Sequence, residues 1–87
     1  MSSNFGSKEL IKALLALDFI QDRQTGSRHL KFSTPDGWKI PENCRPFIIV
    51  IQNKKYDPYT SKKYFRQLLK LGFKKADILN YLKYNPK

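Results

Sequence analysis

Leucines recur with helical spacing near the start of the chain. Leu10, Leu14 and Leu17 fall on one stripe, which predicts an amphipathic helix over Ser7–Leu17. Ser7 is its expected N-cap, because a serine hydroxyl can accept a hydrogen bond from the first helical turn.

Two further helices are predicted near the end of the chain. The second helix is expected over Ser61–Leu71, with Gly72 ending it because glycine readily adopts a positive φ. The third, shorter helix is expected over about Lys75–Lys83. The side chains expected to face inward are Tyr64, Phe65, Leu68, Leu69, Leu71, Ile78, Leu79 and Leu82.

The middle of the chain has the pattern of β-strands. Phe19–Arg23 is a short β-compatible run, and Gly26 marks the turn after it. In Arg28–Ser33 the apolar Leu30 and Phe32 alternate with polar side chains, which is typical of a strand with one buried face. We therefore expect a hairpin with a polar outer face.

A third strand is predicted from the unbroken β-branched run Phe47–Ile51, which we expect to be central or well covered in the sheet. Residues 35–37 have the Pro-Asp-Gly composition of a turn, and Trp38–Arg45 is read as an extended loop or a short extension of the hairpin. The predicted fold class is α+β: one three-stranded antiparallel sheet with the helices on one face. The other face is left to solvent or a ligand, and His29 is expected to point there.

The chain has 87 residues, which favours a single domain over 1–87 with its core at about 7–83. One cysteine, Cys44, and one histidine exclude a disulfide framework and a Cys/His zinc site. No apolar run is long enough to cross a bilayer, and the N-terminus lacks the apolar stretch of a signal peptide. We therefore expect a folded cytoplasmic protein that does not bind a membrane.

Positive charge is concentrated in the second half of the chain. Of the net charge of +10, residues 1–45 contribute +2 and residues 46–87 contribute +8. Such an imbalance favours a polyanionic partner, of which nucleic acid is the first candidate and an acidic protein the second. A lysine-rich face that only aids solubility would give the same composition.

His29 is the residue best suited to catalysis. An imidazole titrates near neutral pH and can take a proton from a ribose 2′-hydroxyl, which then attacks the adjacent phosphate. Lys31 shares the predicted face of His29 and can stabilise charge on the phosphate, and Ser27 and Arg28 are chain neighbours with suitable chemistry. The acidic residues are scattered, so we expect no metal and no cofactor. A lone surface histidine without a function is the alternative.

Basic side chains also gather at the start of the second predicted helix. Lys62, Lys63 and Arg66, together with Lys54 and Lys55, can hold phosphates without sequence preference. The N-terminus of that helix would add its own attraction for a phosphate. A solvated helix face is an equally good interpretation.

Aromatic residues add candidates for base stacking. Tyr56, Tyr59 and Tyr64 lie in or near the basic segment, although Tyr64 is the one expected in the core. Trp38 either stacks on a base or covers the core.

The segment Gly26-Ser27-Arg28-His29-Leu30-Lys31-Phe32 resembles the Gly-Ser-x-His-Leu-Lys motif of the HicA toxins of bacterial toxin–antitoxin modules. Three other segments are similar to the first helix, the hairpin turn and the end of the second helix of that family. They are Ser7–Ile11, Pro35–Gly37 and Phe65–Phe73. Trp38–Arg45 looks like an insertion relative to shorter members.

The resemblance implies a double-stranded-RNA-binding-domain-like (dsRBD-like) fold with an extra C-terminal helix. It also implies an endoribonuclease that cleaves mRNA, with His29 as catalytic residue and Gly26 setting the turn that presents it. A HicB-type antitoxin protein is the implied partner, and we expect it to cover His29. Two alternatives stay open: a non-catalytic RNA-binding module of similar fold, and a basic adaptor for an acidic protein.

Overall fold

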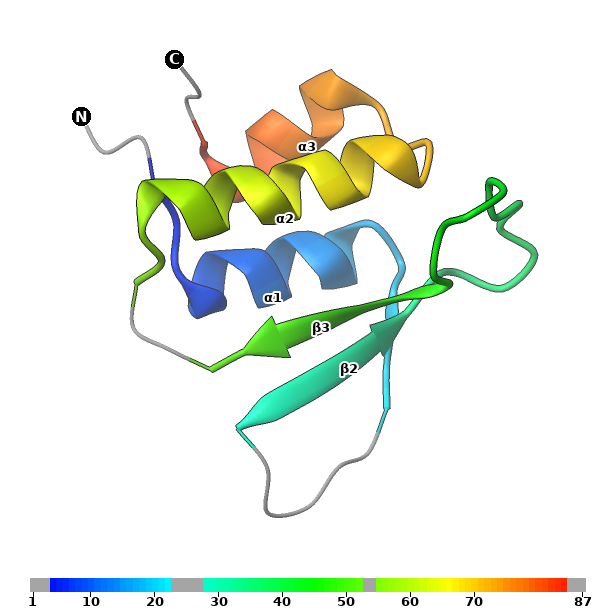
Figure 1. The fold of residues 1–87 in the computed structure, drawn as a ribbon, viewed down its shortest axis with the longest axis horizontal. Coiled ribbons are helices and arrows are strands. Elements are labelled where there is room, and N and C mark those ends of the chain that lie inside the picture. The colour runs from blue at the N-terminus through cyan, green and yellow to red at the C-terminus, as the bar shows by residue number, and fades with distance from the viewer. Residues whose placement is uncertain (1–3, 23–27, 53–54, 85–87) are drawn as a thin grey trace.

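The computed structural model describes residues 4–22, 28–52 and 55–84. These residues form a small α+β domain in which a helix is followed by three strands and two helices (Figure 1). The elements are α1 (Ser7–Ala16), β1 (Ile20–Gln21), β2 (His29–Ser33), β3 (Phe47–Ile51), α2 (Pro58–Lys70) and α3 (Lys75–Leu82). The predicted element order is confirmed.

The three strands form one antiparallel sheet in the order β1-β2-β3. In the β2–β3 pair, His29 lies opposite Ile51 and Ser33 lies opposite Phe47. β2 is therefore the central strand and β3 lies at an edge. Of the two expected placements of the apolar run, the structure supports the covered one. Its inward side chains, Ile48 and Val50, are fully buried, and its backbone edge is covered by α2.

The N-cap of helix α1 lies one residue earlier than expected. Gly6 is the N-cap and Ser7 is the first helical residue, so the assignment of Ser7 as the cap was wrong. The carboxylate of Glu9 accepts a hydrogen bond from the Gly6 N–H at 2.8 Å, which satisfies a backbone donor at this helix start. Of the predicted strand Phe19–Arg23, Ile20 and Gln21 form β1. Phe19 is buried in the core, and Arg23 lies outside the described residues.

Helix α2 begins three residues earlier than predicted, at Pro58. Proline is tolerated there because the first helical position has no intrahelical partner for an N–H. The preceding Asp57 accepts a hydrogen bond from the Thr60 N–H at 2.6 Å and acts as N-cap. Gly72 has φ +102° directly after the C-cap Leu71, as expected for a residue that ends a helix.

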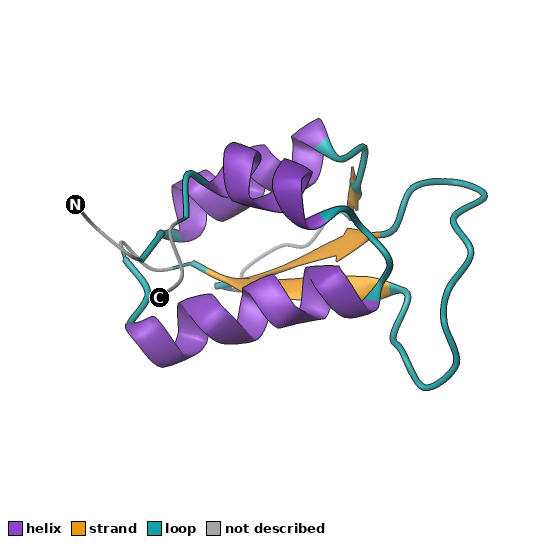
Figure 2. Cartoon of the chain, turned by 90° about the horizontal axis from the view of Figure 1, so that it is seen from above, coloured by secondary structure: helices purple, strands orange, loops and turns teal. Residues whose placement is uncertain are grey.

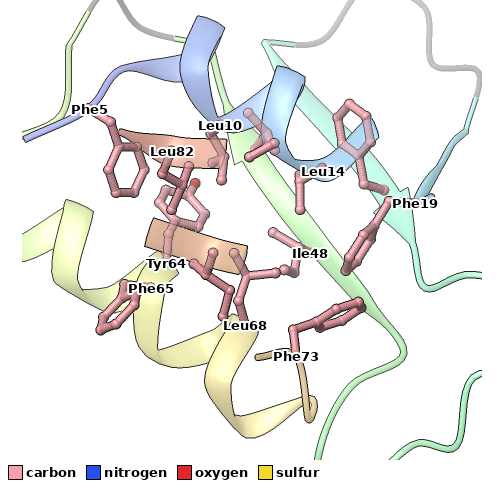
Figure 3. Close-up of a cluster of buried hydrophobic side chains, with 14 of the residues drawn as sticks. Phe5, Leu10, Leu14, Phe19, Ile48, Tyr64, Phe65, Leu68, Phe73 and Leu82 are labelled. Carbon is pink, nitrogen blue, oxygen red and sulfur yellow. The ribbon is translucent and has the colours of Figure 1, made fainter. Parts of the chain in front are cut away.

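The helices lie on one side of the sheet and enclose the core between them and it (Figures 1 and 3). Side chains from α1, β3 and α2 point toward one another in this layer, among them Leu10, Leu14, Ile48 and Leu68. On β2, Phe32 is fully buried and Leu30 packs against the core. The predicted alternation along Arg28–Ser33 is confirmed. The opposite face of the sheet is only partly polar, because the residues of β3 that lie opposite His29, Lys31 and Ser33 are apolar.

The long segment between β2 and β3 is a loop that projects from one end of the sheet (Figure 2). Trp38 attaches it to the turn between α2 and α3. The indole Nε1 donates to the Leu71 carbonyl oxygen at 2.8 Å, and the ring stacks on Phe73 with centroids 4.2 Å apart. Of the two roles considered for Trp38, the structure supports covering the core.

Candidate functional site

His29 is the first residue of β2 and its side chain is exposed. It lies on the outer face of the sheet, because Leu30 and Phe32 occupy the inner face. Its cross-strand neighbour is Ile51, at the end of β3 that leads toward α2. The expected direction of His29 is confirmed.

Lys31 shares the outer face with His29 but is already engaged by two groups. Its Nζ lies 4.0 Å from Oδ2 of Asp22 and 4.6 Å from the ring centroid of Phe47. Both contacts are attractive for a lysine ammonium group and hold it at this position. Lys31 is therefore less available to a phosphate than its sequence position suggested.

The other residues of the predicted motif are placed only in part. Arg28 is exposed directly before β2, and its carbonyl oxygen accepts a hydrogen bond from the Gln52 N–H at 2.8 Å. Gly26 and Ser27 lie outside the described residues, as does Lys54 of the basic cluster. The structure therefore assigns them no position relative to His29.

A groove of about 530 Å³ runs between β3 and α2, and His29 lines it. Ile51, which lies opposite His29, also lines it, and α2 contributes Tyr59 and Lys63. The other end is lined by Arg45 and Lys70. The structure thus brings together His29 and Lys63, two candidates that the sequence placed on separate elements.

The floor and the wall of this groove differ in character. Phe47, Ile49 and Ile51 of β3 supply an apolar floor. The wall is α2, whose residues 58–70 include four basic side chains and no acidic one. Among the described residues that line the groove, none is acidic.

A second hollow of about 470 Å³ lies on the outer side of the same helix. It shares Tyr59, Lys63, Gln67 and Lys70 with the groove. Those four residues are spaced by three or four positions, so they form one stripe along α2. The remaining residues that line this hollow are Lys62 and Arg66.

Three residues of the predicted basic cluster, Lys62, Lys63 and Arg66, line this hollow together. Lys55, Lys62, Lys63 and Arg66 are all exposed in or near α2. However, the expected phosphate site at the helix N-terminus was wrong, because the carboxylate of Asp57 occupies it. Hydrogen bonds from Thr60 lower the pKa of Asp57, so the cap carries a negative charge that disfavours a phosphate there.

Two of the three tyrosines considered for base stacking have structural roles. Tyr64 is buried, as expected, and its hydroxyl contacts the backbone of Ile49 and Ile51. Tyr56 is buried too, and its hydroxyl donates to the Ile51 carbonyl oxygen at 2.6 Å. Burial, and secondarily the neighbouring Tyr64, raise the pKa of Tyr56 well above its usual value. Tyr59 differs: 78% of its surface is exposed.

Lys70 and Arg45 at the far end of the groove were not among the predicted site residues. The spacing of Lys70 from Lys63 on one helix could have indicated it, since positions seven apart share a face. Arg45 reaches the groove only because the loop before β3 folds toward α2, where Cys44 Sγ lies 3.8 Å from the Lys70 carbonyl oxygen. No pattern in the sequence indicates that approach.

Residues 4–22, 28–52 and 55–84 contain no group of three or more His, Cys, Asp or Glu side chains placed to hold a metal ion. Over the same residues, no helix is long and apolar enough to span a membrane.

Comparison with known proteins identifies no relative of this chain. No family model matches it, and neither a curated protein nor a solved structure shows significant similarity. The groove and its side chains are therefore the basis on which its function is argued.

Proposed function

We propose that this protein is a metal-independent endoribonuclease that cleaves mRNA, with His29 as its general acid or base. The observation that carries the proposal is the position of His29. It is an exposed imidazole that lines the same groove as Lys63, beside a helix without acidic residues. Such an arrangement places an imidazole, a side chain suited to proton transfer, where a polyanion would bind.

The reaction needs few groups. His29 takes the proton of a ribose 2′-hydroxyl, and the resulting oxygen attacks the adjacent phosphorus. The bond from phosphorus to the 5′-oxygen of the next nucleotide breaks, and that oxygen takes up a proton. The products are a 2′,3′-cyclic phosphate and a 5′-hydroxyl end, so no redox partner and no added nucleophile is required.

A cation near the scissile phosphate would stabilise the extra charge of the transition state. Lys63 is the better candidate, because the Lys31 amine already faces Asp22 and Phe47.

The motif Gly26–Phe32 and the element order support a relation to the HicA toxins. A dsRBD-like arrangement consists of a helix, three antiparallel strands and a helix, and α3 would be an addition to it. The proposal includes a cytoplasmic toxin whose HicB-type antitoxin covers His29. Covering one exposed proton-transfer group would be sufficient to silence the enzyme.

The test is cleavage of a single-stranded RNA by the wild type and by His29→Ala, each with and without EDTA. We expect the wild type to cut RNA in EDTA, to leave 5′-hydroxyl ends, and to leave a DNA strand of the same sequence intact. His29→Ala should lose at least a hundredfold in rate, whereas Gln52→Ala, a change at a neighbouring exposed residue, should retain full activity. Equal cleavage by the wild type and His29→Ala would refute the proposal.

A non-catalytic RNA-binding module is the second candidate. It is favoured by the contact of Lys31 with Asp22, which makes this amine less available to a scissile phosphate. In that case RNA would bind and stay intact, and His29→Ala would bind as the wild type does.

A further inference from the structure

The groove between β3 and α2 combines two surfaces that suit different parts of a nucleotide. The apolar floor of Phe47, Ile49 and Ile51 offers contact to the faces of bases. The cations along it, Lys63, Lys70 and Arg45, offer contact to phosphates. A ligand that uses both must expose bases and phosphates together.

A single strand meets this requirement and a duplex does not. In an A-form duplex the bases are stacked inside and the surface presents phosphates and 2′-hydroxyls. A duplex could therefore contact the lysines on α2 but would leave the apolar floor empty. The length of the groove also suits a short run of nucleotides, because Tyr59 and Lys70 lie about 16 Å apart along the helix.

Tyr59 lines the same groove as His29 and could hold a base there. It lines both the groove and the neighbouring hollow, so its ring forms part of the border between them. With 78% of its surface exposed, the ring contributes little to the core. An exposed aromatic ring flanked by cations is the usual platform for an unpaired base.

We propose that this groove binds single-stranded RNA, with one base stacked on Tyr59 and the backbone phosphates on Lys63 and Lys70. The inference rests on the proposed function, from which it takes RNA as the ligand. It adds that the RNA is single-stranded and that Tyr59 is the side chain that selects it. The base on Tyr59 would place the adjoining ribose toward His29, since both residues line the groove.

The test measures binding separately from cleavage. The probe is a fluorescently labelled RNA with 2′-O-methyl groups throughout, which cannot undergo attack by a 2′-oxygen. Its affinity is measured by anisotropy as a single strand and as a blunt duplex with its complement. The variants are Tyr59→Ala and Lys63→Gln, and the matched controls on α3 are Tyr81→Ala and Lys75→Gln, which lie outside both hollows.

We expect the wild type to bind the single strand at least tenfold more tightly than the duplex. Tyr59→Ala should weaken single-strand binding by about 5- to 100-fold, the range for loss of one stacked base, and should leave duplex binding unchanged. Tyr81→Ala and Lys75→Gln should weaken single-strand binding less than twofold. Equal affinity for single strand and duplex, or equal effects of Tyr59→Ala and Tyr81→Ala, would overturn the inference.

The two proposals fail in different ways. If the single strand binds as expected but His29→Ala does not change cleavage of unmodified RNA, binding in the groove is supported and the catalytic role of His29 is refuted. If cleavage depends on His29 while Tyr59→Ala binds the single strand as tightly as the wild type does, the catalytic role of His29 is supported and base stacking on Tyr59 is refuted.

Discussion

The hydroxyl of Tyr64 accepts a hydrogen bond from the backbone N–H of Ile51 at 3.2 Å. The same hydroxyl donates to the carbonyl oxygen of Ile49 at 2.8 Å, and Tyr56 donates to the carbonyl oxygen of Ile51. These backbone groups lie at the free edge of β3, where a strand of another chain could otherwise pair. Two tyrosines thus close the edge of the sheet and hold α2 beside it.

Tyr64→Phe should destabilise the domain and open this edge. The substitution keeps the ring in the core but leaves the Ile51 N–H and the Ile49 carbonyl without their partner. We expect a loss of about 1–3 kcal/mol in the free energy of unfolding, measured by urea denaturation.

Tyr59→Phe is the matched control for that change, because it removes a hydroxyl from an exposed ring and should shift stability by less than about 0.5 kcal/mol. Amide hydrogen exchange gives a second readout. Protection of the Ile51 amide should fall in Tyr64→Phe by more than the global loss of stability explains. Unchanged Ile51 protection would contradict the assigned role.

Trp38→Phe should loosen the loop between β2 and β3. Phenylalanine can retain the stacking on Phe73 but cannot donate to the Leu71 carbonyl oxygen. We expect a loss of about 1 kcal/mol in unfolding free energy, the usual net value of one such bond. Lys39→Ala, at the exposed neighbouring position, should be neutral, and a neutral Trp38→Phe would show that the indole bond contributes nothing.

Asp57 should make the stability of α2 sensitive to acid. Hydrogen bonds from Thr60 lower the pKa of Asp57 in the folded protein from its ordinary value of 3.8. The contribution of the ionised cap is therefore complete above about pH 4 and is lost as the pH falls through the folded-state pKa. Thermal unfolding of the wild type and Asp57→Asn, followed from pH 7 to pH 2, checks this.

Asparagine retains an oxygen that can cap the helix but does not titrate, so it isolates the effect of charge. The wild type should be the more stable protein at pH 7, and its advantage should disappear at the acid end. A difference between the two melting temperatures that stays constant over this range would contradict the assignment.

Lys63→Gln should reduce the salt dependence of RNA binding. Each phosphate contact contributes about 0.7 to the slope of log affinity against log salt for a single strand. Removing one contact should therefore lower the slope by about that amount while weakening binding to all sequences alike. Lys75→Gln on α3 should leave the slope unchanged, and an equal decrease in both variants would mean that only net charge matters.

Much of the fold could be predicted from local patterns. Helical spacing of leucines indicated α1, alternation in Arg28–Ser33 indicated β2 and the outward direction of His29, and Gly72 marked the end of α2. These features depend on neighbours within one turn or one strand, which the sequence states directly. Two helix starts were predicted wrongly. The N-cap of α1 is Gly6 and not Ser7, and α2 begins at Pro58 and not at Ser61. Helix boundaries are the part of an element that a sequence pattern defines least well.

The sequence by itself determined the elements, their order, the excess of positive charge and the face on which His29 lies. Only the tertiary structure decided that β3 is an edge strand, that tyrosines close it, and that His29 shares a groove with Lys63 and Arg45. Those relationships join residues far apart in the chain. They depend on how α2 packs beside the sheet, which follows from the summed burial of many side chains and from no single local pattern.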